Sequence, residues 1–519
     1  MQDRLTDEKI RRFICDGFLV VDVDLPASFH AHVEEKLRFS IEQEFPMGNN
    51  ILPRIPEMYQ VLDSAPVVCA LTSLLGADYL LHPHRAVHTS TPLEHKTEHK
   101  NVQLTPEVNA PAMGKGSMAG SGWHQDAQSP LARARYHVPR HLILFYFPHD
   151  TEVDMGPTRL EAGSYLFSHP EKPVYPILPN FVARGTVFIV HFDMVHAGFS
   201  NLSERMRYVV KFVASRTRNP DTLPSPPDWT TPDNIHARYP LEPVWSHVWR
   251  WLHGLAHVPM TQSAPSEITQ VKRLNRIYSA VPDESQISKL IDELMSLKGS
   301  NRHQRELRTT DSGKRIPRDM PTKIPRWNER AIVMEDSAYA LALAGDEAVK
   351  AICALFELDD PWISINACFA LGEIGNSEAV PTLVEALKNS HQQIVRQALD
   401  ALGVLGHPIN DALAEIERLM TISHDKWLEP EVMRGWTAQD QVRLNAVFAL
   451  LNVIHLEGSD LRTIEHILIN SLDDPNGYVP EVSCEALRRI NTPTAIAAAF
   501  KYLQRHRWDS SLVGGQKIY

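Results

Sequence analysis

An H-x-D motif, a later histidine and a later arginine are the residues of this chain whose types and spacing could do chemistry. His124 and Asp126 flank Gln125. On an extended segment, residues i and i+2 point to the same side, so His124 and Asp126 can reach one metal ion together while Gln125 points away. His196 must then come from a different strand, and Arg207 offers a planar fork that can bind a carboxylate through two hydrogen bonds. Two histidines and one aspartate form the facial triad that holds non-heme Fe(II) with open coordination positions.

The H-x-D pattern alone is weak, because the chain contains 25 histidines and a second H-x-D at His191 and Asp193. Taken singly, such a histidine is more often a surface or core-edge residue than a ligand. If His191 and Asp193 were the metal pair, the second histidine would come from residues 236–257. That segment is rich in proline and tryptophan, and no later strand there carries an arginine. His124, Asp126, His196 and Arg207 do fit the whole pattern of a metal pair, a later histidine and an arginine on the next strand.

Residues 1 to about 215 resemble the phytanoyl-CoA dioxygenase family of Fe(II)/2-oxoglutarate oxygenases. Four segments carry the resemblance: an opening helix and strand, the metal motif, a Gly-Pro segment, and the distal histidine with its following arginine, at residues 5–21, 123–126, 155–165 and 196–207. Two positions depart from the family. Ala162 stands where the family usually has proline, and Tyr165 where it usually has histidine. Neither position is a metal ligand in the family, so the departures concern the substrate side of the site.

The resemblance implies a 2-oxoglutarate-dependent dioxygenase in which the first H-x-D pair and His196 bind Fe(II). Arg207 would pair with the distal carboxylate of 2-oxoglutarate. Such an enzyme uses O₂ to hydroxylate an unactivated C–H bond of a small organic substrate, and releases succinate and CO₂. Hydroxylation is favoured over halogenation, because related halogenases replace the carboxylate ligand by a small residue. The resemblance also places His88 at the co-substrate pocket, and Gln125 is a further candidate for co-substrate binding.

These site residues need strands to position them, and three apolar runs have the right pattern. Residues 141–147 and 185–195 are predicted as strands, the second ending just before the distal histidine. Residues 206–214 are a third, in which alternation places Arg207 and Lys211 on one face. Many short strands separated by turns, with metal ligands near the strand ends, suit a double-stranded β-helix, the cupin-like jelly roll.

Three other segments have more than one interpretation. Residues 79–89 form a strand candidate whose alternation could aim His82 and His84 into the barrel mouth, although a solvated strand face is more usual. Residues 90–121 are a long loop that becomes rich in Gly, Ala and Met, interpreted either as a lid or as disorder. The basic run at residues 133–140 could face an anionic substrate, but we expect a solvated positive face.

Composition shifts and repeats divide the chain into three parts. We expect an oxygenase domain at residues 1–218, a Pro/Trp-rich and basic connector with some helices at 219–333, and an all-α part at 334–519. In the last part, the pattern of residues 360–375 recurs at 391–406, an offset of 31 residues, and weaker copies follow. This period indicates a solenoid that resembles HEAT repeats. It could present a concave surface to a protein partner, brace the barrel, or close over its mouth.

The bulk composition is that of a globular protein, with 43% hydrophobic and 22% charged residues. A net charge of −11 argues against a general nucleic-acid binder. The five scattered cysteines include no C-x-x-C pair, which argues against a disulfide framework and favours a reducing cytoplasm. The charged start of the chain predicts no signal peptide, and no apolar run is long enough to predict a membrane span.

Two hypotheses stay open beside the small-molecule oxygenase. An oxygenase could act on a protein or a carrier-bound substrate held by the solenoid, which an exposed apolar groove on the repeats would favour. A non-catalytic scaffold with a relic barrel is the other, and the intact ligand set argues against it. Zinc could occupy the same three ligands, but Arg207 would then have no obvious purpose. The substrate is not identified, and nothing in the sequence points to a CoA thioester.

Overall fold

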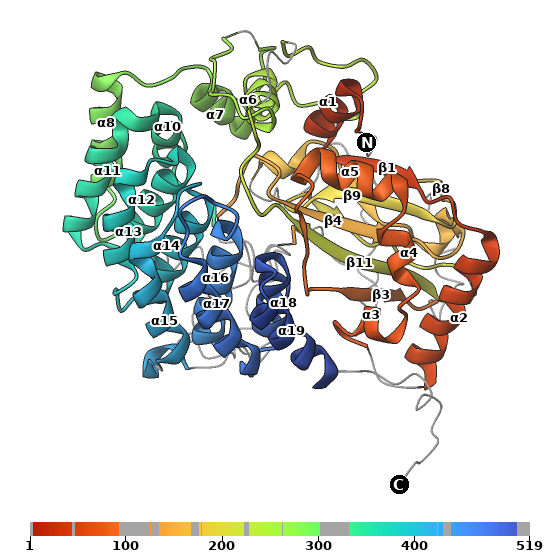
Figure 1. Cartoon of the computed structure of the whole chain (residues 1–519). Coiled ribbons are helices and arrows are strands. Elements are labelled where there is room, and N and C mark those ends of the chain that lie inside the picture. The colour runs from red at the N-terminus through yellow and green to blue at the C-terminus, as the bar shows by residue number, and fades with distance from the viewer. Residues whose placement is uncertain are drawn as a thin grey trace, which may run out of the picture.

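The computed structural model describes residues 4–43, 47–92, 125–126, 134–167, 176–177, 179–222, 228–261, 263–300, 332–422, 424–428 and 437–505. A β-sheet part, red to yellow in Figure 1, lies beside a helical array coloured teal to blue, and a few green helices connect the two. Among the helices within these ranges, none is long and apolar enough to cross a membrane.

Five helices flank the main sheet: α1 (Asp7–Asp16), α2 (Ala27–Gln43), α3 (Ile51–Arg54), α4 (Met58–Leu62) and α5 (Ala65–Leu75). Helix α1 begins after Thr6, whose side chain accepts a hydrogen bond from the backbone amide of Lys9. It ends at Gly17, whose φ of 76° is the left-handed conformation that glycine adopts without strain. A Cβ at Gly17 would also overlap the side chain of Met194, so this turn needs glycine for packing as well.

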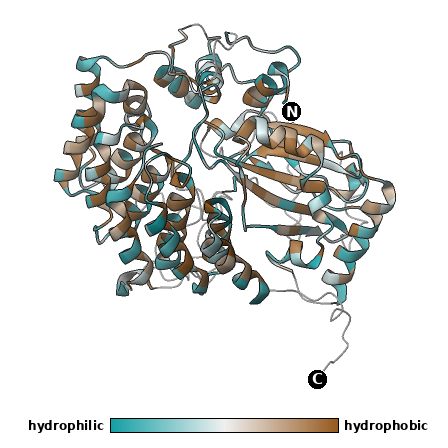
Figure 2. Cartoon of the chain, viewed as in Figure 1, coloured by the Kyte–Doolittle hydropathy of each residue, from teal (hydrophilic) through white to brown (hydrophobic). Residues whose placement is uncertain are grey.

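Six antiparallel strands form the main sheet: β1 (Phe18–Asp22), β2 (Leu80–Leu81), β3 (Ala86–Ser90), β4 (His141–Tyr146), β9 (Thr186–His191) and β11 (Arg207–Ser215). Their order is β1-β9-β4-β11-β2, and β3 also pairs with β11. The three predicted apolar strands are confirmed as β4, β9 and β11, and Figure 2 shows strong hydrophobic colour on these central strands. Directly opposite residues share a face, so Lys211 lies on the same face as Phe145 and Ala86.

A smaller sheet packs against this face. It joins β10 (His196–Ala197), β6 (Arg159–Glu161) and β7 (Pro176–Ile177), while β5 (Thr151–Glu152) and β8 (Phe181–Val182) form a separate pair. The ring centroids of His196 and Phe145 lie 5.4 Å apart, so the two sheets meet at the predicted distal histidine. The described strands therefore form an antiparallel arrangement of a large and a small sheet.

The connecting segment contains α6 (Glu242–Leu252), α7 (Thr269–Tyr278) and α8 (Glu284–Met295). Trp245 and Trp249 of α6 are almost fully buried, and the guanidinium of Arg11 on α1 lies 4.5 Å from the Trp249 ring centroid. The ring of Trp251 lies against the guanidinium of Arg216, which follows β11. Helix α6 is therefore a packing element that covers the end of the sheet.

The helical array contains α10 (Asp336–Ala344), α11 (Val349–Ala354), α12 (Pro361–Ile374), α13 (Val380–Ala386), α14 (Gln392–Val404), α15 (Leu413–Thr421), α16 (Ala438–Val453), α17 (Leu461–Asn470), α18 (Tyr478–Ile490) and α19 (Pro493–Arg505). The repeated patterns of the sequence correspond to α12, α14, α16 and α18. Small residues let these helices approach closely: a Cβ at Gly372 would lie 2.8 Å from the Cα of Ala401. The predicted solenoid pattern of stacked helix pairs is confirmed.

The stacked helices α12, α14, α16 and α18 also contact the β-sheet part. Arg140 donates to Glu373 of α12 at 2.7 Å, and the Tyr136 hydroxyl donates to Asp400 of α14 at 2.6 Å. Farther along, Arg489 of α18 donates to the backbone carbonyl of Tyr79 at 3.1 Å. One face of the solenoid is thus used for docking on the sheet.

This docking corrects the strand predicted at residues 79–89. That segment is divided into β2 and β3, and the histidines between them contact the solenoid. The His82 ring stacks on Phe448 of α16, with centroids 5.5 Å apart, and His84 Nδ1 is 2.8 Å from the hydroxyl of Tyr478 on α18. Both interpretations of His82 and His84, a solvated strand face and an orientation into the barrel mouth, were therefore wrong, because local alternation carries no information about a distant docking partner.

The basic run of residues 133–140 was also misjudged as a solvated face. Arg135 is buried and donates to the backbone carbonyl of Phe167 at 2.6 Å. His137 is buried against Tyr278, and Arg140 makes its ion pair with the solenoid. Residue 133 lies outside the described residues. The described charges of the run are structural links between the three parts of the chain.

We expect Arg140→Met to lower the free energy of unfolding by about 2–3 kcal/mol, because it leaves the carboxylate of Glu373, whose side chain is only 17% exposed, without its partner. Arg184→Met is the matched control. Its ion pair with Asp150 has the same 2.7 Å separation but is exposed, so its loss should cost about 1 kcal/mol or less. Urea denaturation followed by circular dichroism measures both, and equal small losses would contradict the structural role of Arg140.

Candidate active site

Asp126 and His196 come together in a buried place between the two sheets. His196 Nε2 lies 3.7 Å from Asp126 Oδ2, and the residues are only 3% and 7% exposed. Asp126 lies in a two-residue described stretch at the end of the predicted metal motif, and His196 begins β10. The sequence predicted that these two side chains would converge from separate segments, and the structure places them so.

The orientation of His196 suits metal binding. Its Nδ1 is 2.9 Å from the backbone carbonyl of Met194, which assigns the proton to Nδ1, so that Nε2, on the side of Asp126, carries the lone pair that a metal ion would need. Metal-binding histidines commonly hold their second ring nitrogen in this way. The amide of Val195 donates to Ser164 Oγ at 2.9 Å and fixes the backbone before the ring.

A third ligand is needed for a facial triad, and the predicted one, His124, lies outside the described residues. Within the described ranges, no group of three His, Cys, Asp or Glu side chains could hold a metal ion. An imidazole nitrogen and a carboxylate oxygen that converge in a buried place are nevertheless donors that suit Fe(II). The two described residues therefore fit the implied metal.

A buried lysine completes the described site. The ammonium of Lys211 pairs with Asp126 Oδ2, and the lysine is 4% exposed. Lys211 lies on β11, on the same face as Arg207. Alternation placed it on that face in the sequence, but no role was predicted for it. A lysine at i+4 from the predicted arginine, within an apolar strand, was the signal that could have found it.

Arg207 is also buried, at 5% exposure, and its Nη1 donates to the backbone carbonyl of Gly156. Burial lowers its pKa to about 10, which still leaves the guanidinium positively charged at neutral pH. Gly156 has a φ of 75°, and a Cβ there would lie 2.7 Å from the carbonyl oxygen of Ser200. The glycine thus allows the backbone approach that positions the Arg207 guanidinium.

His88 lies on β3 directly opposite Val209, on the sheet face shared with Arg207 and Lys211. Its side chain is exposed. Asn201 connects this strand to the turn after the distal histidine, because its Nδ2 donates to the carbonyls of Ser90 at 2.8 Å and Arg205 at 2.7 Å. The role of His88 in co-substrate binding stays a prediction.

Gln125 points away from Asp126, as extended geometry predicts. Its Nε2 donates to the backbone carbonyls of Phe167 at 3.0 Å and Asp193 at 2.6 Å. The side chain is 1% exposed. Gln125 therefore anchors the metal motif to two neighbouring loops, and its role as a co-substrate ligand stays a prediction.

The second H-x-D has a packing role. The amide of Asp193 donates to His191 Nδ1 at 3.2 Å, and the His191 ring stacks on Tyr165 with centroids 4.2 Å apart. Burial lowers the pKa of His191 to about 3 and raises that of Asp193 to about 6. The Tyr165 hydroxyl donates to the carbonyl of Ile14 on α1 at 2.7 Å. Tyr165 thus attaches α1 to the end of β9.

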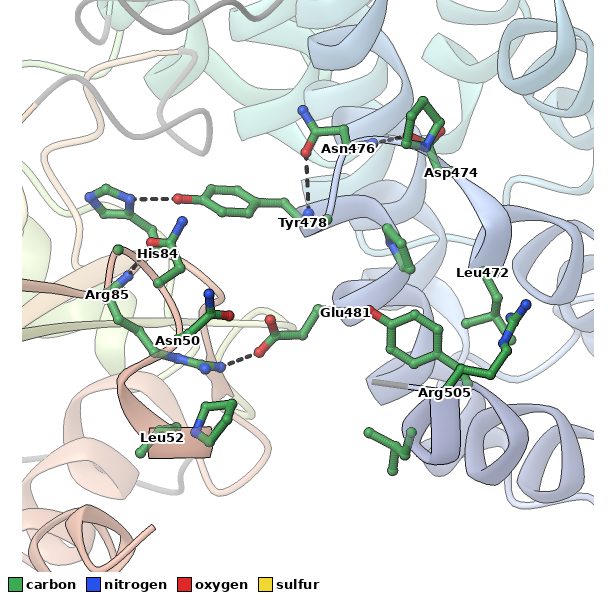
Figure 3. Close-up of a pocket in the computed structure, with 18 of the residues that line it drawn as sticks. Asn50, Leu52, His84, Arg85, Leu472, Asp474, Asn476, Tyr478, Glu481 and Arg505 are labelled. Atoms are coloured by element: carbon green, nitrogen blue, oxygen red, sulfur yellow. Dashed lines mark hydrogen bonds and ion pairs between the residues drawn. The ribbon is translucent and has the colours of Figure 1, made fainter. Parts of the chain in front are cut away.

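A separate cleft of about 1690 Å³ lies between the β-sheet part and the last repeats, as Figure 3 shows. Two contacts cross it: the His84–Tyr478 hydrogen bond and an ion pair between Arg85 and Glu481. The cleft exceeds the roughly 300–1000 Å³ of small-molecule sites. Neither Asp126 nor His196 lines it. Its crossing contacts hold the start of β3, the strand that carries His88.

Comparison with solved structures finds low similarity to non-heme oxygenases. The apo non-heme monooxygenase ThoJ is 18% identical, with 43% of this chain and 84% of that chain covered and a TM-score of 0.30. The α-ketoglutarate-dependent epimerase SnoN from nogalamycin biosynthesis is 16% identical, with 40% and 82% covered and a TM-score of 0.31. EctD from S. alaskensis with bound Fe is 14% identical, with 42% and 79% covered and a TM-score of 0.30.

Comparison with protein families matches residues 333–429 to the HEAT repeats. This range contains α10 to α15 and both copies of the strongest repeated pattern. A search of curated protein sequences finds no match. The predicted HEAT-like nature of the helical part is therefore confirmed for these residues.

We expect Gly156→Ala to lower the free energy of unfolding by about 2–4 kcal/mol, from left-handed backbone strain plus overlap with the 199–200 carbonyls. Gly48→Ala is the control, because Gly48 has a φ of 55° and no atom within 4 Å of the added Cβ. Its cost should be about 1 kcal/mol, from backbone strain alone. Urea denaturation of both variants measures the difference, and equal losses would show that the carbonyl overlap is relieved.

Proposed function

We propose that this protein is an Fe(II)- and 2-oxoglutarate-dependent dioxygenase. It would hydroxylate an unactivated C–H bond of a small organic substrate, consuming O₂ and 2-oxoglutarate and releasing succinate and CO₂. The observation that carries the proposal is the buried convergence of Asp126 and His196 against a strand face that presents two cations, Arg207 and Lys211. Positive side chains beside a metal-binding pair would suit an anionic co-substrate.

In this proposal, His124, Asp126 and His196 hold Fe(II). When bound, iron and 2-oxoglutarate supply the O₂ chemistry that protein side chains lack. Arg207 binds the distal carboxylate of 2-oxoglutarate, oriented by the Gly156 carbonyl. Burial of Asp126 and His196 keeps water from the reacting groups.

We propose further that the two antiparallel sheets close into a double-stranded β-helix within residues 1–218, with a connector at 219–333 and the solenoid at 334–519. The solenoid face that carries Glu373, Asp400 and Phe448 is occupied by the β-sheet part. This docking favours a brace over a free surface for a carrier-bound substrate. A small-molecule substrate is therefore the preferred hypothesis.

An anaerobic titration with Fe(II) and 2-oxoglutarate tests the function. The wild type should develop the weak visible metal-to-ligand absorption band of an iron–oxoacid complex. Arg207→Ala should weaken 2-oxoglutarate binding by about 10- to 100-fold, because a charge-assisted hydrogen-bond pair is lost. His196→Ala should abolish the band by removing a ligand.

Arg205→Ala is the matched control, because Arg205 is exposed and pairs with Glu34 away from the site. It should bind 2-oxoglutarate as the wild type does. A folded wild-type protein that takes up iron and gives no band would contradict the oxygenase function and favour the scaffold hypothesis.

A further inference from the structure

The proposed function uses Lys211 only as a second positive charge on the strand face and assigns its buried ammonium no partner once metal and co-substrate are bound. Its ammonium pairs with Asp126, one of the proposed iron ligands, and the two side chains are 5% and 10% exposed. Asp126 is the only partner of the ammonium among the described residues. A lysine is rarely kept in such a place, because a charge taken out of water needs a compensating partner.

The pair with Asp126 cannot persist unchanged in an iron-loaded site. A divalent cation bound to the Asp126 carboxylate would lie close to the Lys211 ammonium, which pairs with the same carboxylate. The two positive charges would repel each other. Because the ammonium sits on a flexible four-carbon stem, it can move away from the carboxylate while staying in the site. Once moved, it again needs an anionic acceptor in the buried interior.

The position of Lys211 on β11 indicates what that acceptor is. Lys211 and Arg207 are four residues apart on one face, so their Cα atoms are separated by about 13 Å. Arg207 lies toward the Gly156 carbonyl, and Lys211 lies toward Asp126. A dicarboxylate that enters with one end at Arg207 brings its other carboxylate to the metal side, where Lys211 is.

We propose that Lys211 is an exchanging counter-ion that also recognises the co-substrate. In the metal-free protein it neutralises Asp126. When iron and 2-oxoglutarate are bound, it pairs with the 2-oxoglutarate carboxylate nearest the metal. The site thus selects an acid with a carboxylate at each end by means of two buried cations. This inference rests on the proposed function of the same site.

The test compares Lys211→Met with the wild type in two anaerobic binding measurements. The first is the affinity for Fe(II) without 2-oxoglutarate, and the second is the affinity for 2-oxoglutarate at saturating Fe(II). The substitution keeps the length of the side chain and removes its charge. Fe(II) should bind more tightly, because the competing ammonium is gone. 2-Oxoglutarate should bind about 10- to 100-fold more weakly, because a charged hydrogen bond to the carboxylate is lost. These opposite shifts distinguish an exchanging counter-ion from a structural partner of Asp126.

Two controls accompany the variant. Lys36→Met removes a lysine whose ammonium lies 2.5 Å from Glu57 at the surface, and both affinities should be unchanged. Lys211→Arg keeps the positive charge and should restore most of the 2-oxoglutarate affinity. If Lys211→Met does not fold, Lys211→Gln is measured in the same way.

The outcomes separate the two proposals. Weaker Fe(II) binding, or unchanged 2-oxoglutarate binding, in the Lys211 variant would overturn the role of Lys211 while leaving the oxygenase intact. A wild-type protein that binds Fe(II) but not 2-oxoglutarate would instead overturn the proposed function itself.

Discussion

The candidate site depends on one electrostatic constraint, the burial of opposite charges between two sheets. Asp126 and Lys211 are each nearly inaccessible to water, and each would be costly to bury alone. The pair therefore ties a loop segment to the central part of β11. Because β11 is hydrogen-bonded to β4, β3 and β2, a side chain anchored on it is held by most of the main sheet. This rigidity is what a site for metal and oxoacid chemistry requires, since its groups must keep their positions without solvent to reorganise.

Much of this arrangement was predictable from the sequence. The apolar runs that became β4, β9 and β11 have the length and composition of buried strands, and local chemistry fixed the cap at Thr6 and the stop at Gly17. The convergence of Asp126 and His196 followed from the joint pattern of an H-x-D motif, a later histidine after a strand-like run and an arginine on the next strand. The helix repeats followed from an internal period and small residues at fixed places, and residues 333–429 match the HEAT family.

What could not be predicted depends on contacts between distant segments. His82 and His84 alternate like residues of a strand, yet they contact solenoid residues about 370–400 positions later in the chain. Arg135 and Arg140 resemble a solvated charge run, yet they bind a backbone carbonyl and Glu373. Tyr165 packs on His191 and donates to the carbonyl of Ile14, two contacts with segments distant in the sequence. In each case the partner is a loop or helix whose position only the folded chain specifies.

The docked face of the solenoid has a consequence for how the protein unfolds. A free helical-repeat array behaves as a one-dimensional chain of neighbours and frays from its ends. Here α18, near the end of the array, is tied to the β-sheet part through Tyr478, Glu481 and Arg489. Fraying at this end therefore has to break contacts with Tyr79, which precedes β2, and with His84 and Arg85, which connect β2 to β3, at the same time. The repeats should lose their independence and melt together with the sheet, as one cooperative unit instead of a linear array.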